Sequence, residues 1–283
     1  MRALRKPILT ILPFLVAFGI LTQISDSPMQ SFLTPPLKNV LGLKISKRLE
    51  TVIQEANRLW ETNIQFEFSQ LPDIHGAFDA NSTPPRILLN KETGLTEANI
   101  AHEIVHAILV KNGFPTTNKL FEGRRNDVVQ ELTSVIQHMP LVRFLHERGF
   151  DVLEYFEPTL NQIQENLPKY DEKKADNYKH PFYVHYLSIT YLRLRYEAVF
   201  LEKDKKEYFT NLFYTYTPIG TRLGKSLEMI INNSNPYSPE GNALALYNCL
   251  RYLNTETLGG QVPKFRENLY DPWIVNLEKK YKF

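Results

Sequence analysis

The chain has 283 residues, of which 43% are hydrophobic and 23% are charged, and these fractions are ordinary for a globular protein. Its formal net charge of +2 argues against nucleic acid as a main partner, because nucleic-acid-binding domains usually carry a clear basic excess. The single cysteine, Cys249, excludes an intramolecular disulfide framework and a cysteine-based zinc cluster.

Residues 1–25 have the pattern of an export signal. Arg2, Arg5 and Lys6 precede the almost uncharged run 8–24, so a basic region is followed by an apolar one. The cleavage pattern after this run is poor, and the run is at the short limit for crossing a bilayer. The segment is therefore a cleaved signal peptide or a retained membrane anchor, with a buried N-terminal helix as the third alternative. We expect the protein to be exported to the periplasm or the extracellular space, or to be anchored in the membrane.

Residues 26–36 contain three prolines and predict a linker to the body of the protein. The body opens with helical spacing over residues 45–61. One face of this expected helix is apolar and is formed by Leu49, Ile53, Ala56 and Trp60. Residues 64–69 alternate apolar and polar side chains and predict a strand, an extended segment is expected around 75–78, and residues 86–90 predict a further strand.

Residues 96–113, TEANIAHEIVHAILVKNG, predict a helix with both ends marked. Thr96 is suited to the N-cap position, and Gly113 is suited to the left-handed residue that ends many helices. The stretch between them is apolar nearly all round, so this helix should be buried. Its buried polar side chains therefore need partners.

Those polar side chains form an H-E-x-x-H motif at residues 102–106. Residues four apart lie on one helix face, so His102 and His106 can point their imidazoles at one metal ion. Glu103 lies next to His102, close enough to hold and deprotonate a water on that metal. Buried histidines with a purely structural role are the alternative.

The second half of the chain is predicted to be helical. A helix should start at about Asn126 and close before Pro140, which then opens the next helix, residues 141–148, with Gly149 as its stop. Further helical stretches are expected at 154–167, 181–201, 205–214, 219–232 and 241–253.

A hydrolytic zinc site usually has three protein ligands, so the two histidines need a third. The chain lacks the glycine and third histidine that follow the motif in metzincins. HEIVH at 102–106, with QELTS around Glu131, instead resembles the gluzincin type of zinc metallopeptidase. The resemblance implies that Glu131, on the next major helix, is the third ligand, and the apolar residues around it favour this. Glu122 and Asp127 are alternative ligands, and a salt bridge of Glu131 to Arg124 or Arg125 is the structural alternative.

Together the predicted helices and strands indicate an α+β fold that is predominantly helical. The resemblance covers about residues 86–140 and implies a zincin-like arrangement of these elements. A small sheet would pack on the H-E-x-x-H helix, with its edge strand along the substrate cleft. Residues 37–150 would then be a zincin-like metal-binding subdomain, and residues 151–283 a helical subdomain that completes the cleft.

The remaining candidate residues are those that could stabilise the oxyanion, the negatively charged oxygen that forms when water attacks the substrate carbonyl. His138 lies seven residues after Glu131 on nearly the same face, where it can stabilise the oxyanion, support a ligand, or cap its own helix. Zincins often supply an oxyanion donor from the helical half, and Tyr183, His185 and Tyr186 fit this role by residue type. Tyr183 is the candidate that we select.

The sequence therefore predicts a zinc-dependent metallopeptidase, a hydrolase of peptide or protein substrates. Zinc held by His102, His106 and Glu131 would lower the pKa of a bound water, and Glu103 would take its proton. The alternative is an exported, non-catalytic binding or interaction protein on a zincin-like or helical scaffold. A zinc-dependent esterase or amidase has the same sequence features.

Overall fold

The computed structural model describes residues 37–71, 74–115, 124–170, 182–255, 258, 277 and 279–282, without the side chains of 124–127. The predicted export segment, residues 1–25, and the predicted linker, residues 26–36, lie outside the described residues. Within those ranges, no helix is both long enough and apolar enough to cross a membrane.

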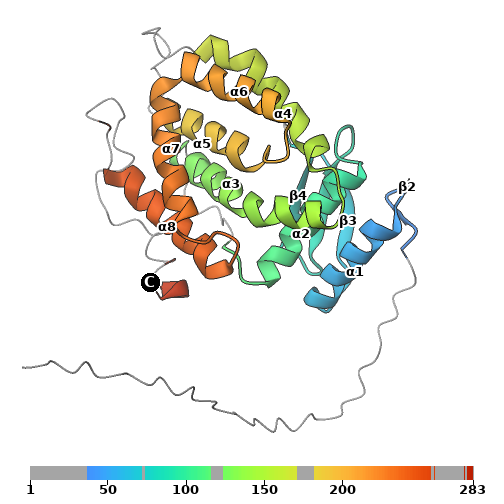
Figure 1. The fold of residues 1–283 in the computed structure, drawn as a ribbon. Helices are drawn as coiled ribbons and strands as arrows, with labels where there is room; N and C mark the ends of the chain where they lie inside the picture. Colours follow the sequence, from blue (N-terminus) through green and yellow to red (C-terminus); the bar gives the residue numbers. More distant parts are fainter. Residues whose placement is uncertain are drawn as a thin grey trace, which may run out of the picture. The chain divides into compact units, whose positions relative to one another are not determined.

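The described part is mostly helical with two small sheets, which confirms the predicted α+β class (Figure 1). The strands are β1 (Asn39–Val40), β2 (Leu43–Lys44), β3 (Gln65–Ser69), β4 (Gly76–Asp79) and β5 (Arg86–Asn90). The helices are α1 (Lys47–Trp60), α2 (Glu97–Lys111), α3 (Arg124–Glu147), α4 (Val152–Asn166), the 3-10 helix η1 (Leu167–Tyr170), α5 (Tyr183–Tyr196), α6 (Lys203–Tyr216), α7 (Pro218–Asn232) and α8 (Pro239–Thr255).

The larger sheet has the strand order β3-β5-β4. β5 is central, and it pairs in parallel with β3 and antiparallel with β4. Ile87 and Leu89 of β5 are fully buried and belong to the same hydrophobic core as α1 and α2, because alternate residues of a strand point to one face. This arrangement leaves β4 as an edge strand among the described residues.

Helix α2 begins and ends where the sequence predicts. The Thr96 side chain accepts a hydrogen bond from Asn99 N–H at 3.1 Å, and Gly113 has φ +89°, the left-handed conformation that closes the helix. Glu97 in the first turn accepts hydrogen bonds from the backbone and the hydroxyl of Ser46, which is itself the N-cap of α1. The starts of α1 and α2 are therefore joined by this one carboxylate.

The prediction that a helix closes before Pro140 is wrong, because α3 runs without a break through Pro140 to Glu147. Proline has no N–H to donate to the carbonyl of Ile136, four residues earlier. The side chain of Asn242, on α8, donates to that carbonyl at 2.9 Å instead. A residue distant in sequence thus satisfies the acceptor that the proline leaves open, and the helix continues.

Residues 36–283 belong to one compact unit. Three hydrophobic cores build this unit. The first contains α1, the larger sheet, α2 and the end of α3; the second contains α3, α5, α7 and α8; the third contains α4, α5 and α6. Helices α2, α3, α4 and α5 come from different cores and together line one pocket.

Candidate metal centre

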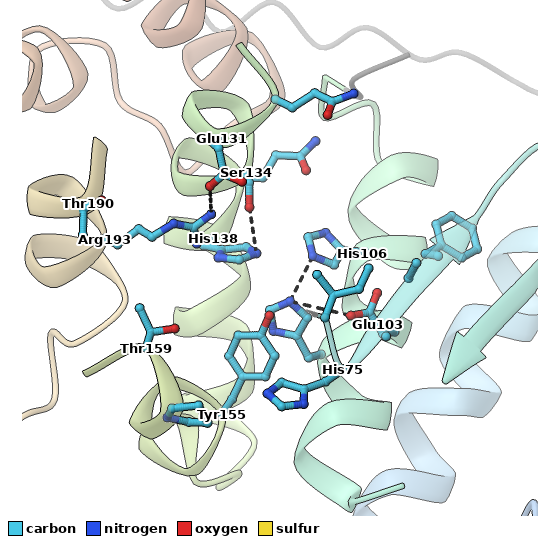
Figure 2. A pocket seen from close by; sticks show the side chains of 18 of the residues that line it. His75, Glu103, His106, Glu131, Ser134, His138, Tyr155, Thr159, Thr190 and Arg193 are labelled. Carbon is cyan, nitrogen blue, oxygen red and sulfur yellow. Dashed lines mark hydrogen bonds and ion pairs between the residues drawn. The ribbon is translucent and has the colours of Figure 1, made fainter. Parts of the chain in front are cut away.

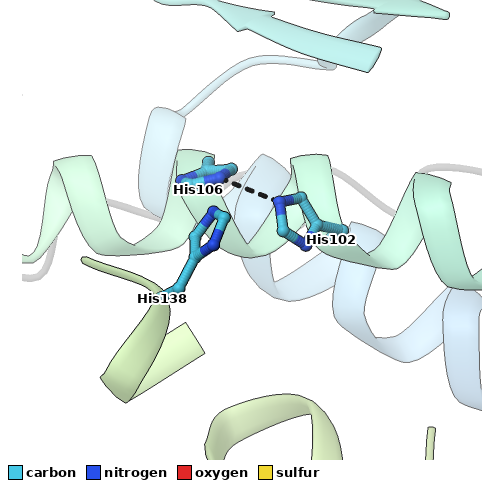
Figure 3. Close-up of side chains that lie close together, drawn as sticks. All are labelled: His102, His106 and His138. Atoms are coloured by element: carbon cyan, nitrogen blue, oxygen red, sulfur yellow. Dashed lines mark hydrogen bonds between the residues drawn. The ribbon is translucent and has the colours of Figure 1, made fainter. Parts of the chain in front are cut away.

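Three imidazoles converge from two helices (Figure 3). His102 and His106 lie one turn apart on α2, as the motif predicts, and His138 comes from α3. One ligand atom of each lies within 4.8 Å of the others, and the Nε2 atoms of His102 and His106 are 3.1 Å apart. Two nitrogens bound to one tetrahedral zinc at the usual bond length are about 3.3 Å apart, so this spacing suits one ion.

The two histidines of α2 are held in the form that binds metals. Burial, and then the neighbouring His106 and His138, keep the pKa of His102 well below its ordinary value of 6.5. Burial, and then His138, lower the pKa of His106 to about 3. Neutral imidazoles keep a free lone pair for a cation.

The donor set fits a resident metal ion. The Nδ1 atom of His102 is buried and has no hydrogen-bond partner among the described residues. Three neutral nitrogen ligands suit zinc, and also copper, iron or nickel. The residues that would hold the ion are His102, His106 and His138.

Glu103 is buried beside this group, with a side-chain exposure of 7%. Its Oε1 lies 4.0 Å from the Nε2 of His102. Burial raises the pKa of the Glu103 carboxyl to about 8. A nearby cation favours the ionised form of a carboxyl group, so a metal ion at the three histidines would return Glu103 toward the carboxylate.

The sequence predicted Glu131 as the third ligand, but the structure brings His138 to the two histidines instead. Oε2 of Glu131 lies 2.5 Å from Nη2 of Arg193, on α5. Figure 2 shows Glu131 turned to Arg193, whereas His138 contacts Ser134 on its own helix, at 3.4 Å, and lies near His106. Both residues lie on one face of α3, but seven residues separate them by roughly 10 Å along the axis, so only one can meet α2 at this point.

The two alternative ligands fall on parts of the chain that the structure does not describe. Glu122 lies outside the described residues, and the side chain of Asp127 is among those not described. The expected salt bridge of Glu131 to Arg124 or Arg125 also falls on undescribed side chains. Its observed partner, Arg193, comes from another helix.

His138 also has a buried partner on its other ring nitrogen. Its Nδ1 lies 2.7 Å from Oε1 of Glu197, on the turn that follows α5, and Arg193 donates to the same oxygen at 2.7 Å. Burial alone would raise the pKa of Glu197, but the Arg193 guanidinium and His138 outweigh it and hold this pKa below its ordinary value. Glu197 is therefore a buried carboxylate with two partners.

Tyr183, the predicted oxyanion donor, is engaged elsewhere, since its hydroxyl donates to the carbonyl of Tyr170 at 2.8 Å. His185 lies in the next turn of α5 and its ring meets that of Phe182, with centroids 5.7 Å apart. The tyrosine at the centre is Tyr155 of α4, which the sequence analysis did not select. Its ring stacks on that of His102 with centroids 3.8 Å apart and an angle of 16° between the planes.

The histidines, Glu103 and Tyr155 line a pocket of about 1020 Å³ (Figure 2). Residues 74–81, which include β4, form one wall, and residues of α4 and α5 form the opposite one. The edge strand therefore borders the candidate centre. Comparisons with protein-family models, with curated proteins and with solved structures found no match to this chain.

Proposed function

We propose that the protein is a zinc-dependent metallopeptidase whose metal ligands are His102, His106 and His138. The single observation that carries the proposal is the convergence of these three imidazoles beside the buried carboxyl of Glu103, in a pocket. When bound, the ion supplies Lewis-acid chemistry and a water that is acidic near neutral pH.

Glu103 is the proposed proton carrier. Its carboxylate accepts the proton of the attacking water and then transfers it to the nitrogen that leaves the cleaved bond. Its Oε1 lies 4.0 Å from Nε2 of His102, which is the ring nitrogen that faces His106. Burial excludes bulk water from this carboxylate, so the proton passes between the two reacting groups.

Tyr155 is the proposed donor to the oxyanion that develops on the scissile carbonyl. Stacking on His102 fixes the ring next to the centre. Burial raises the pKa of the Tyr155 hydroxyl, so this hydroxyl keeps its proton and can donate a hydrogen bond. A donor placed before the reaction stabilises the transition state more than the substrate.

A peptide is the substrate class that the pocket favours. Among the described strands β4 pairs only with β5, and its residues line the pocket. An extended peptide laid along an open strand edge gains main-chain hydrogen bonds irrespective of its side chains. The basic and apolar start of the chain supports export or membrane anchoring as the setting of this activity.

The test is the metal content and peptide hydrolysis of the purified full-length chain and three variants. We expect about one zinc per chain, which His138→Ala loses and Glu131→Ala keeps. Glu103→Gln should keep the metal and lose hydrolysis. Zinc lost in Glu131→Ala but kept in His138→Ala would restore Glu131 as the ligand. A folded wild-type chain without zinc would instead favour the non-catalytic interaction protein.

A further inference from the structure

A ladder of four charged or polar side chains joins α3 to the end of α5. From the open side inward, Glu131 pairs with Arg193, Arg193 pairs with Glu197, and Glu197 meets His138. The side chain of Glu131 is 46% exposed, whereas that of Glu197 is 3% exposed. The ladder therefore runs from the pocket wall to a completely buried carboxylate behind the metal centre.

We infer that Glu197 is the positioning residue of the centre, which holds His138 with Nδ1 protonated and the Nε2 lone pair turned to His102 and His106. The inference rests on the proposed function, because it explains what orients His138, the third proposed metal ligand. A carboxylate only accepts hydrogen bonds, so the nitrogen 2.7 Å from Oε1 must carry the proton. The other nitrogen is then unprotonated in the neutral ring.

His138 needs such a partner more than the other two ligands do. His102 and His106 share one helix, so the spacing of α2 sets their separation. His138 belongs to α3, so its position relative to His102 and His106 also depends on the rotation of its ring. The 2.7 Å contact with Glu197 fixes that rotation, in the way that carboxylates behind metal-bound histidines commonly do.

Arg193 orients the carboxylate of Glu197 and compensates its negative charge. Nη1 of Arg193 donates to the same Oε1 that faces His138, and Nη2 is held by Glu131. A buried carboxylate without a cation would be strongly unfavourable, so the arginine makes the arrangement possible. The two carboxylates and one guanidinium leave one net negative charge behind the imidazole, which favours a cation on its other nitrogen.

The first readout is the tautomer of His138 in the metal-free full-length chain, from nitrogen NMR of ¹⁵N-histidine-labelled protein. We expect a protonated Nδ1 in the wild type and in Glu197→Gln, because an amide oxygen facing Arg193 still accepts. We expect Glu197→Ala to give a mixture of tautomers. A wild-type ring protonated on Nε2, or an unchanged tautomer in Glu197→Ala, would overturn the inference.

The second readout is zinc affinity, measured by competition with a chelator. Glu197→Ala should bind zinc roughly 10- to 100-fold more weakly, and Glu197→Gln should retain part of the affinity. The matched control is Glu228→Gln, which removes the partner of Arg195, another arginine of α5, and lies outside the centre. Equal affinities in Glu197→Ala and this control would contradict the positioning role.

Glu197→Ala leaves Arg193 buried without its inner partner and can fail to fold for that reason. The double variant Arg193→Leu/Glu197→Leu removes both buried charges and gives the same test. A wild-type chain that binds no zinc would refute the proposed function, while the tautomer would still decide whether Glu197 orients His138. The two failures are therefore distinct.

Discussion

Gly76, on the edge strand β4, packs directly against the side chain of Glu103. A Cβ atom on Gly76 would lie 2.8 Å from Cγ and 3.2 Å from Oε1 of Glu103. Gly76→Ala should therefore displace the carboxyl group or the strand. We expect a stability loss of about 1–3 kcal/mol, as for other overpacked sites, together with reduced hydrolysis and an unchanged zinc content. Denaturant unfolding and metal analysis measure these effects.

The control for this prediction is a double-mutant cycle with Glu103→Ala, which removes the atoms that the new methyl group would meet. In that background Gly76→Ala should cost much less stability, because the two residues act through their contact. An equal cost in both backgrounds would show that the strand needs glycine for another reason.

Tyr155→Phe separates the two roles of this tyrosine. The phenyl ring keeps the stacking on His102, so fold and zinc affinity should stay near the wild-type values. Loss of the hydroxyl should lower kcat about 10²- to 10³-fold if it donates to the oxyanion. Steady-state hydrolysis of a peptide by the zinc-loaded chain measures this. A kcat within a few-fold of wild type would remove Tyr155 from the mechanism.

Tyr183→Phe is the matched control, and it also tests the tyrosine that the sequence favoured. The Tyr183 hydroxyl donates to the Tyr170 carbonyl, so its loss should cost about 1 kcal/mol of stability. We expect hydrolysis to be unaffected. A large loss of kcat in Tyr183→Phe, with Tyr155→Phe active, would reverse the assignment.

The parts of the site that local pattern determines were predictable. The ends of α2 follow from Thr96 and Gly113, and the shared face of His102 and His106 follows from their spacing. The strands at 65–69 and 86–90 follow from alternation and from turn residues beside them. Each of these features depends on residues close together in the chain.

The third histidine of the group was not predictable in the same way. Glu131 and His138 share one face of α3, and the sequence does not say which of them reaches the level of α2. That choice depends on Arg193, which draws Glu131 to α5, and on the continuation of α3 past Pro140. Tyr155 likewise belongs to no motif, because only the packing of α4 on α2 places its ring on His102.

The contribution of Glu103 to the stability of the metal-free protein should fall between pH 6.5 and 8. In this range folded Glu103, with a pKa of about 8, holds a proton that the unfolded chain, with a pKa near 4.5, has lost. The folded state then binds more protons, so its stability decreases as the pH rises. The loss is about 2 kcal/mol at about 1.4 kcal/mol per pH unit. The lowered pKa values of His102, His106 and His185 act in the opposite direction up to about pH 7.5, because an unfolded histidine is still half protonated at its ordinary pKa of 6.5.

Urea unfolding of the metal-free chain at several pH values in this range measures the slope. Glu103→Gln cannot ionise and keeps only the rise that the histidines cause, so the difference between the two curves is the contribution of Glu103. Saturating zinc should also remove this contribution from the wild type, since a cation stabilises the carboxylate. Parallel curves for the wild type and Glu103→Gln would show that Glu103 is ionised in the metal-free fold.

Asn242 should be among the costliest polar residues to remove, because it allows α3 to continue through Pro140. Its side chain is fully buried and donates to the carbonyls of Ile136 and Pro236, both at 2.9 Å. Asn242→Ala leaves the Ile136 carbonyl without a donor, at a cost of about 1–3 kcal/mol.

In a Pro140→Ala background the new backbone N–H can bond to the Ile136 carbonyl, so the Asn242→Ala change should cost about 1 kcal/mol less. The bond to Pro236 is lost in both backgrounds and cancels in the comparison. Urea midpoints of the four proteins give the coupling, and a coupling of zero would mean that α3 passes the proline without help from α8.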